Sequence, residues 1–270
     1  MAIRLLQFSL FWLALAFSGL SQANETAQDL RTLHQVQLDL LEVASLFHRY
    51  QGSEGNKKFY VEITNKLDDV KSALASTETA LTRHNLVAEA ATLNEAKTQY
   101  LQNLNTALAS IKNGGFAAFS IIDAYLNAND TILATLANSY QAINTAGNYK
   151  VPSLVTALRK ETLLMQRMYA KYIEISSSQF GYTPRSGQDN VETIDQLAAR
   201  FSRDLDKIKS EIPVNSPYAE RLNDVKTKWL FLEKSFVNYT EKTVPYLITK
   251  FGKQIIEELS AIAKEMESDS

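Results

Sequence analysis

The sequence contains two similar copies of one predicted helical segment, and this repetition constrains the fold more than any other feature. Residues 93–101 read LNEAKTQYL and residues 222–230 read LNDVKTKWL, which are identical at five of nine positions. Three further pairs occur in the same order along the chain: FHRY (47–50) with YAKY (169–172), LDDVKSAL (67–74) with LDKIKSEI (205–212), and ILATLA (132–137) with ELSAIA (258–263). Because similarity at a series of matching helices indicates a repeated unit, we predict an internal duplication.

The spacing of apolar residues predicts helices throughout and favours no strand. Apolar residues recur every three or four positions, which places them on one face of a helix. Three such stripes are Val36, Leu40, Val43, Phe47 and Tyr50; Leu93, Ala96, Tyr100, Leu104, Ala107 and Ile111; and Leu222, Val225, Trp229, Leu232, Phe236 and Tyr239. The predicted helices span about 26–51, 57–76, 86–112, 116–144, 153–178, 189–211, 217–241 and 243–267, with ends uncertain by about two to four residues.

These helices predict an all-α protein made of two up-down-up-down four-helix bundles. Short connections favour antiparallel neighbours, so that four consecutive helices close into one bundle. We predict a first bundle over 24–145 and a second over 152–270, joined near 145–152. The pattern leaves open whether the bundles stack end to end or lie side by side.

The first 23 residues have the features of a secretory signal peptide. Arg4 precedes a mostly apolar run over 5–17, and Ser21 and Ala23 occupy the −3 and −1 positions of a cleavage site. An uncleaved N-terminal anchor is the alternative, although a bilayer span needs about 20 apolar residues. We therefore predict a periplasmic or secreted protein without a membrane span after cleavage.

Composition and motifs argue against several functions. The chain has no Cys, which excludes disulfides and thiolate chemistry, and its formal charge of −2 predicts no nucleic-acid partner. The three histidines, His34, His48 and His84, lack metal-ligand spacing, and we expect them at the surface or partly packed. Since no catalytic or nucleotide-binding motif is present either, we predict a protein that is not an enzyme and holds no cofactor or metal.

One basic stripe is the best candidate for a binding site. Lys160, Arg167 and Lys171 follow one face of a predicted helix, whereas the equivalent positions of the first bundle supply only Arg49 as a cation. Arg can bind a carboxylate, nitrate or phosphate by donating two parallel hydrogen bonds, and Lys adds a point charge. A solvated helix face is the alternative. The long polar loop at 176–190, with Phe180 and Tyr182, is a second candidate, because loops often carry function.

The same helix carries a resemblance to a known family. LLMQRMYAKYI at 163–173 resembles the signature of PilJ-type helical sensor domains, which are found in type IV pilus chemotaxis transducers and related nitrate sensors. Thr162 stands where that signature has its leading Arg. The resemblance implies a small anion held among helices of the second bundle and a membrane-bound sensor or receptor as partner.

Two functions follow as expectations. The first is an exported sensor or ligand-binding accessory protein that recognises a small anion and acts with a membrane signalling partner. The second is a structural or interaction module, such as a spacer, an adhesion or biofilm factor, or a holdase, with no small ligand.

The cleavage site gives the first testable prediction. The exported protein should begin at Asn24, because Ser21 and Ala23 fit the small side-chain pockets of a signal peptidase. Intact mass measurement of protein recovered from the exporting host decides this. A mass that includes residues 1–23 would instead indicate an uncleaved anchor.

Overall fold

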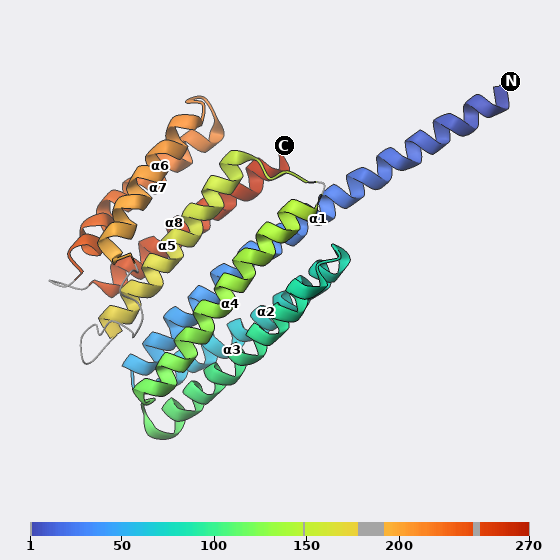
Figure 1. The fold of residues 1–270 in the computed structure, drawn as a ribbon. Helices are drawn as coiled ribbons and strands as arrows, with labels where there is room; N and C mark the ends of the chain where they lie inside the picture. The colour runs from blue at the N-terminus through green and yellow to red at the C-terminus, as the bar shows by residue number, and fades with distance from the viewer. Residues whose placement is uncertain (1, 148, 178–191, 240–243, 270) are drawn as a thin grey trace.

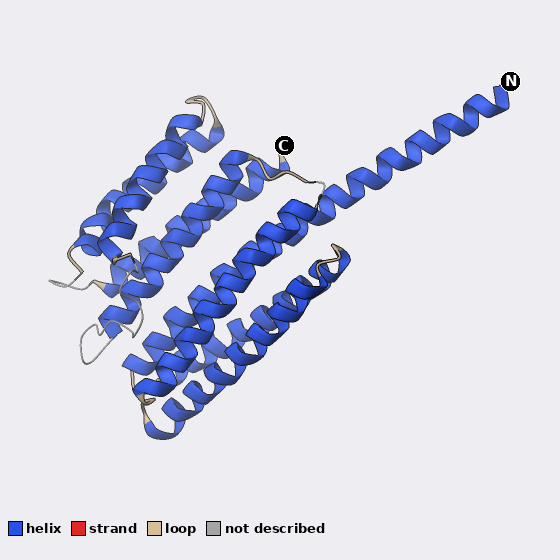
Figure 2. Ribbon diagram, viewed as in Figure 1, coloured by secondary structure: helices blue, strands red, loops and turns tan. Residues whose placement is uncertain are grey.

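The computed structural model describes residues 2–147, 149–177, 192–239 and 244–269, with side chains from Ala23 onward. The described residues form eight helices and no strand, which confirms the all-α prediction (Figure 2). The helices are α1 (Ala2–Gly52), α2 (Lys57–Arg83), α3 (Val87–Gly114), α4 (Phe119–Ala146), α5 (Ser153–Ser177), α6 (Ile194–Glu211), α7 (Pro217–Val237) and α8 (Pro245–Ser268).

The two bundles lie side by side. Helices α1 to α4 contact one another in one bundle and α5 to α8 in the other, with neighbouring helices antiparallel (Figure 1). The bundles meet where α1 packs along α5. This contact settles the open choice between end-to-end and side-by-side packing. It also makes α1 and α5 the two central helices of the molecule.

Most helix boundaries follow the predicted signals. Ser216 caps α7 by accepting a hydrogen bond from the amide of Tyr218, and Pro217 occupies the first turn. Gly115 ends α3 in the left-handed conformation, at φ 77°. Helix α7 ends at Val237, four residues before its predicted end, and α1 begins well before residue 26.

The predicted end of the second helix, at residue 76, is wrong. The polar run that follows residue 76 contains no helix breaker, and the Thr77 hydroxyl donates to the Ala73 carbonyl within the helix. Leu81, fully buried, holds the last turn of α2 against the core. The helix stops only at Arg83, before Asn85 takes a positive φ of 59°.

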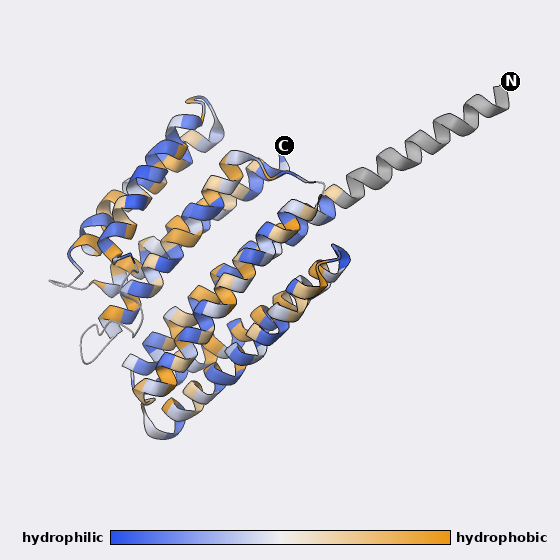
Figure 3. Ribbon diagram, in the orientation of Figure 1, coloured by the Kyte–Doolittle hydropathy of each residue, from blue (hydrophilic) through white to orange (hydrophobic). Residues whose placement is uncertain are grey.

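The predicted apolar stripes form the core. Every stripe residue is buried except Tyr239, which is half-buried, and Trp229 is fully enclosed with its indole N–H donating to Ser202. Figure 3 shows polar and apolar residues in separate stripes along the helices. Lys97 of α3 pairs with Glu78 of α2 at 2.5 Å, and Lys226 of α7 pairs with Asp206 of α6 at 2.9 Å. Both bundles thus use the same kind of ion pair, while the duplication itself stays a prediction.

A buried ion network ties the two bundles together near the C-terminus. Arg31 of α1 and Arg159 of α5 both donate to Glu267 Oε2 of α8, each at 2.8 Å. The Tyr149 hydroxyl donates to the other carboxylate oxygen of Glu267 at 3.1 Å. Arg159 also donates to the Tyr140 hydroxyl of α4 at 3.1 Å. The side chains of Glu267 and Arg159 are only 1% and 6% exposed, so the Glu267–Arg159 pair is desolvated, whereas Arg31 reaches partly into solvent.

At the other end of the interface the central helices touch through a glycine. A Cβ placed on Gly52, the last residue of α1, would lie 2.7 Å from the backbone oxygen of Ser177 at the end of α5. Real Cβ atoms do not approach backbone this closely, so only glycine permits the observed contact.

The beginning of α1 projects away from the bundles in Figure 1. It covers the predicted signal peptide, and its cleavage stays a prediction. From Ala23 onward, in the part of the chain whose side chains the structure describes, no helix has an apolar stretch sufficient to cross a bilayer.

The Glu267 network generates the second prediction. Glu267→Gln removes the negative charge that Arg31 and Arg159 share, which leaves Arg159 buried without a counter-ion. Breaking a buried pair in this way costs about 3–5 kcal/mol, measured as the free energy of unfolding in urea. The control is Glu265→Gln on the same helix, which removes an exposed pair with Arg221 and should cost about 0–1 kcal/mol. Equal losses in the two variants would contradict a structural role for the network.

Candidate functional site

A cavity of about 400 Å³ opens between the two bundles. We call it the α5 cavity, because α5 supplies half of its lining. It is lined by His34 and Gln37 of α1; Ala137, Tyr140 and Gln141 of α4; Thr156, Arg159, Lys160, Glu161, Leu163, Leu164 and Arg167 of α5; and Arg200 and Asp204 of α6. Two helices of each bundle therefore form its walls.

Four cations line the α5 cavity, and two of them form no hydrogen bond or ion pair within the described part of the chain. Arg159 is paired with Glu267, and Arg200 donates to Glu192 at 2.6 Å. Lys160 and Arg167 form no hydrogen bond or ion pair with any residue in the described ranges. Since both line the cavity, their positive charges are available to a ligand.

Arg167 stands beside another arginine. Surrounding protein lowers the pKa of its guanidinium, and the positive charge of Arg200 lowers it further, while Asp130 opposes both effects. The residue as a whole remains exposed, so solvent reaches it through the mouth of the cavity. Two guanidiniums that repel each other at a cavity wall are stabilised when an anion lies between them.

Glu161 is the least expected member of the site. The residue is only 5% exposed, and its Oε2 atom has no hydrogen-bond partner among the described residues. Burial raises the pKa of its carboxyl to about 8, and the negative charge of Asp204 adds to this rise. Arg200, Arg203 and Lys160 lower the pKa by smaller amounts. At neutral pH Glu161 is therefore mostly protonated.

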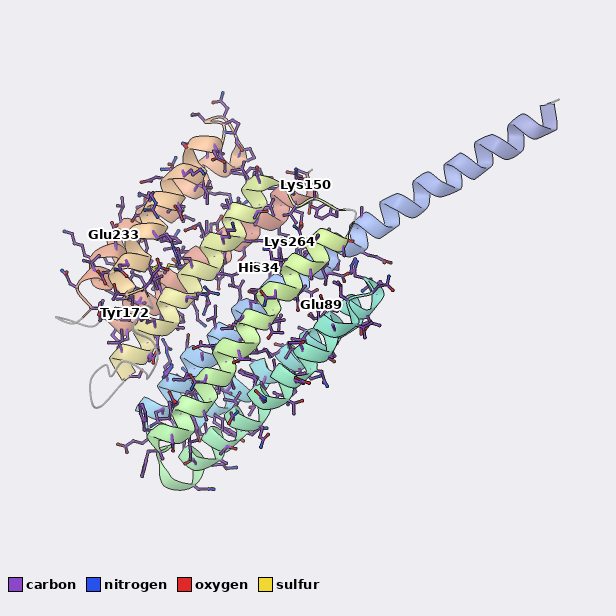
Figure 4. The ribbon with its side chains drawn as sticks, viewed as in Figure 1. His34, Glu89, Lys150, Tyr172, Glu233 and Lys264 are labelled. Carbon is purple, nitrogen blue, oxygen red and sulfur yellow. The ribbon has the colours of Figure 1, made fainter. Side chains whose placement is uncertain are left out.

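His34 corrects an expectation from the sequence. It is only 8% exposed and not a surface residue, and its Nε2 atom has no partner among the described residues. Burial lowers its pKa to about 3, helped by the charge of Arg159, so the ring is neutral. Figure 4 shows His34 near the junction of the bundles, between the outer positions of Glu89 and Glu233. His48, at 9% exposed, is buried as well.

His34 and Arg159 also line a second cavity of about 450 Å³, which we call the α8 cavity. Its other lining residues are Gln28, Arg31, Thr32, Gln35, Ala73, Ser260, Ala261, Ala263 and Lys264. The two side chains therefore form a wall that the α5 and α8 cavities share.

The structure brings together two of the three residues predicted from the basic stripe. Lys160 and Arg167 line the α5 cavity, whereas Lys171 lies outside its lining and donates to the Glu192 backbone oxygen at 3.1 Å. The resemblance implied a site within the second bundle, but the cavity lies between the bundles.

Two other sequence candidates do not join the site. Arg49 lies elsewhere on the interface, where it donates to the Thr249 hydroxyl and stacks over Phe59 and Tyr169. Most of the loop at 176–190, including Phe180 and Tyr182, lies outside the described residues.

Sequence reasoning missed Arg159, Glu161, Arg200 and His34. One signal for Arg159 was present, because it follows Val155 by four residues and precedes Thr162 by three, on the apolar side of the helix. A cation on such a face indicates a buried partner. His34 was a similar case, because it is a titratable residue close in sequence to the apolar residues Leu33 and Val36. No sequence signal placed Arg200 of α6 at the site, because its position there depends on how the helices pack together.

The comparisons with known proteins identify no relative: no family model, no curated protein and no solved structure matches this chain. Among the described residues, no group of three or more His, Cys, Asp or Glu could hold a metal ion. The α5 cavity itself offers cations, a tyrosine hydroxyl and a protonated carboxyl to a small polar ligand.

The third prediction concerns the pH dependence of stability. The Glu161 pKa is raised in the folded state, so unfolding releases its proton, and stability falls as pH rises from about 4.5 towards 8. His34 acts in the opposite sense below pH 6.5, because its pKa is lowered. Above pH 6.5 the contribution of His34 fades as the unfolded imidazole loses its proton, so Glu161 dominates between about pH 7 and 8. There the unfolding free energy should fall by up to about 1.4 kcal/mol per pH unit.

Glu161→Gln removes this slope, because an amide cannot lose a proton in that range. Urea unfolding followed by circular dichroism at several pH values measures the difference from the parent. Glu257→Gln, at an exposed position of α8, is the control and should keep the parent slope. Parallel pH profiles for the parent and Glu161→Gln would contradict the prediction.

Proposed function

We propose that the protein binds a small anion in the α5 cavity and works as an exported sensor or ligand-binding accessory protein. One observation carries the proposal: Arg167 and Arg200 line the same cavity, the charge of Arg200 lowers the pKa of Arg167, and Arg167 forms no hydrogen bond or ion pair within 4 Å among the described residues. Lys160 adds a second unpaired cation. Carboxylates and nitrate are the ligand classes that fit a guanidinium of this kind.

The position of the cavity supports a sensory role over simple storage. Its walls come from α1 and α4 of one bundle and from α5 and α6 of the other. A ligand that contacts both sides binds best to one relative arrangement of the bundles, and it shifts the population towards that arrangement. Such a shift changes the outer surface, which a membrane-bound sensor or receptor could recognise outside the cytoplasm.

Exposed aromatic side chains favour the alternative, an interaction module. Phe116, Phe119 and Tyr246 are 66%, 63% and 73% exposed, although large apolar side chains are usually buried. Phe116 and Phe119 lie at the α3–α4 connection and Tyr246 at the start of α8, at the end opposite the α4–α5 connection (Figure 1). An interaction module predicts loss of partner binding when these aromatics are replaced, without any response to anions.

The fourth prediction tests the anion site. Nitrate, acetate or succinate should raise the melting temperature, because a ligand that binds only the folded state stabilises it. Arg167→Ala should weaken binding of the effective anion about ten- to a hundredfold, since a charge-assisted hydrogen bond contributes about 1.5–3 kcal/mol. Arg167→Lys should fall between, because it keeps the charge and loses the second hydrogen bond.

Lys171→Ala is the matched control. It removes a cation from the same helix, one turn from Arg167 but outside the cavity lining, and should leave anion affinity at the parent value. Isothermal titration measures all four proteins. Equal weakening by Lys171→Ala and Arg167→Ala, or no response of the parent to any of the three anions at millimolar concentration, would argue against the site.

A further inference from the structure

The α5 cavity contains two carboxyl groups as well as its cations, and an anion alone does not account for them. Glu161 and Asp204 both line it, and the charge of Asp204 contributes to the raised pKa of Glu161. A buried carboxyl oxygen without a hydrogen-bond partner is less favourable than a hydrogen-bonded one, because it has lost its contacts with water. The Oε2 atom of Glu161 is such an oxygen.

None of the neighbouring cations satisfies Glu161. Lys160, Arg200 and Arg203 are near enough to influence it, but none donates a hydrogen bond to it. Arg200 donates to Glu192, and Arg203 pairs with Asp204 at 3.3 Å. The cavity therefore presents a buried carboxyl group without a hydrogen-bond partner, Glu161, together with two cations that pair with no carboxylate among the described residues, Lys160 and Arg167.

We propose that the ligand is zwitterionic, a free amino acid whose carboxylate binds Arg167 and Lys160 and whose ammonium group binds Glu161, with Asp204 adding attraction. This inference rests on the proposed anion-binding function and names the ligand class for the same cavity. A zwitterion brings one charge of each sign, which matches a cavity lined by the cations Lys160 and Arg167 and by the carboxyl groups of Glu161 and Asp204.

The proposal has a consequence for protons. The charged groups that act on Glu161 are Lys160 of α5 and Arg200, Arg203 and Asp204 of α6. The α1 wall adds His34, which is neutral, and the α4 wall adds the Tyr140 hydroxyl. An ammonium group against Glu161 favours the carboxylate, so an amino acid that binds at pH 7 releases a proton from Glu161. A simple carboxylate stabilises the protonated form and releases none.

Isothermal titration with matched ligands tests the inference on the full exported protein. The ligand sets are L-alanine with propionate and ethylamine, and L-aspartate with succinate. Titrations in two buffers of different ionisation enthalpy measure proton release. We expect at least one amino acid to bind at least tenfold more tightly than its analogue without the amine, with net release of a proton at pH 7.

Two variants assign the preference to residues. Glu161→Gln should lower amino-acid affinity at least tenfold, erase the preference over the deaminated analogue and abolish proton release. Asp204→Asn should weaken the amino acid less. Glu257→Gln, on the surface of α8, is the control and should keep the preference. Because Gln matches the protonated carboxyl in shape and charge, Glu161→Gln should fold, and circular dichroism checks this.

The outcomes distinguish failure of the zwitterion inference from failure of the proposed anion-binding function. Equal or tighter binding of propionate or succinate would overturn the zwitterion inference and leave the anion proposal standing. Binding of ethylamine as tight as that of alanine would also overturn it. No binding of any ligand in the two sets, together with no response to nitrate or acetate, would overturn both proposals.

Discussion

The carboxylate of Glu267 is the interaction on which the arrangement of the bundles depends. It is almost fully desolvated and neutralised by Arg31 of α1 and Arg159 of α5, with Tyr149 on its second oxygen. Charges buried in this way are stable only with good geometry, because desolvation costs several kcal/mol per ion. The helices that bring these groups together are therefore fixed relative to one another, and Arg159 is held at the wall of the α5 cavity. Apolar stripes close each bundle, whereas the ion network specifies how the bundles meet.

Periodicity predicted the helices and the core because it reports on neighbours three and four residues apart. Tyr100 and Trp229 were placed correctly in the core, and Gly115 and Ser216 ended and began their helices as their backbone preferences require. The site could be predicted only in part. Lys160 and Arg167 follow from spacing along α5, but the approach of Arg200 and His34 depends on packing between helices distant in sequence. Lys171 shares the spacing and misses the cavity, because one more turn of α5 carries it beyond the lining.

The α5 cavity combines groups that would be unstable together in a uniform environment. Unpaired cations occupy its more exposed wall, where water screens their repulsion, while the uncharged forms of Glu161 and His34 occupy its interior. The protonation states follow from depth: burial disfavours charge on both groups, which raises the pKa of an acid and lowers that of a base. The same depth leaves the Oε2 atom of Glu161 and the Nε2 atom of His34 without hydrogen-bond partners among the described residues.

The wall between the α5 and α8 cavities has a thermodynamic consequence. His34 and Arg159 face both spaces, and each side chain can adopt only one position at a time. If a molecule in one cavity displaced Arg159, it would reshape the other cavity, and the affinities of the two spaces would then be linked. By reciprocity, occupancy of the α8 cavity would change affinity in the α5 cavity by the same factor as the reverse. The ion pair that holds Arg159 to Glu267 would then determine how strongly the two spaces influence each other.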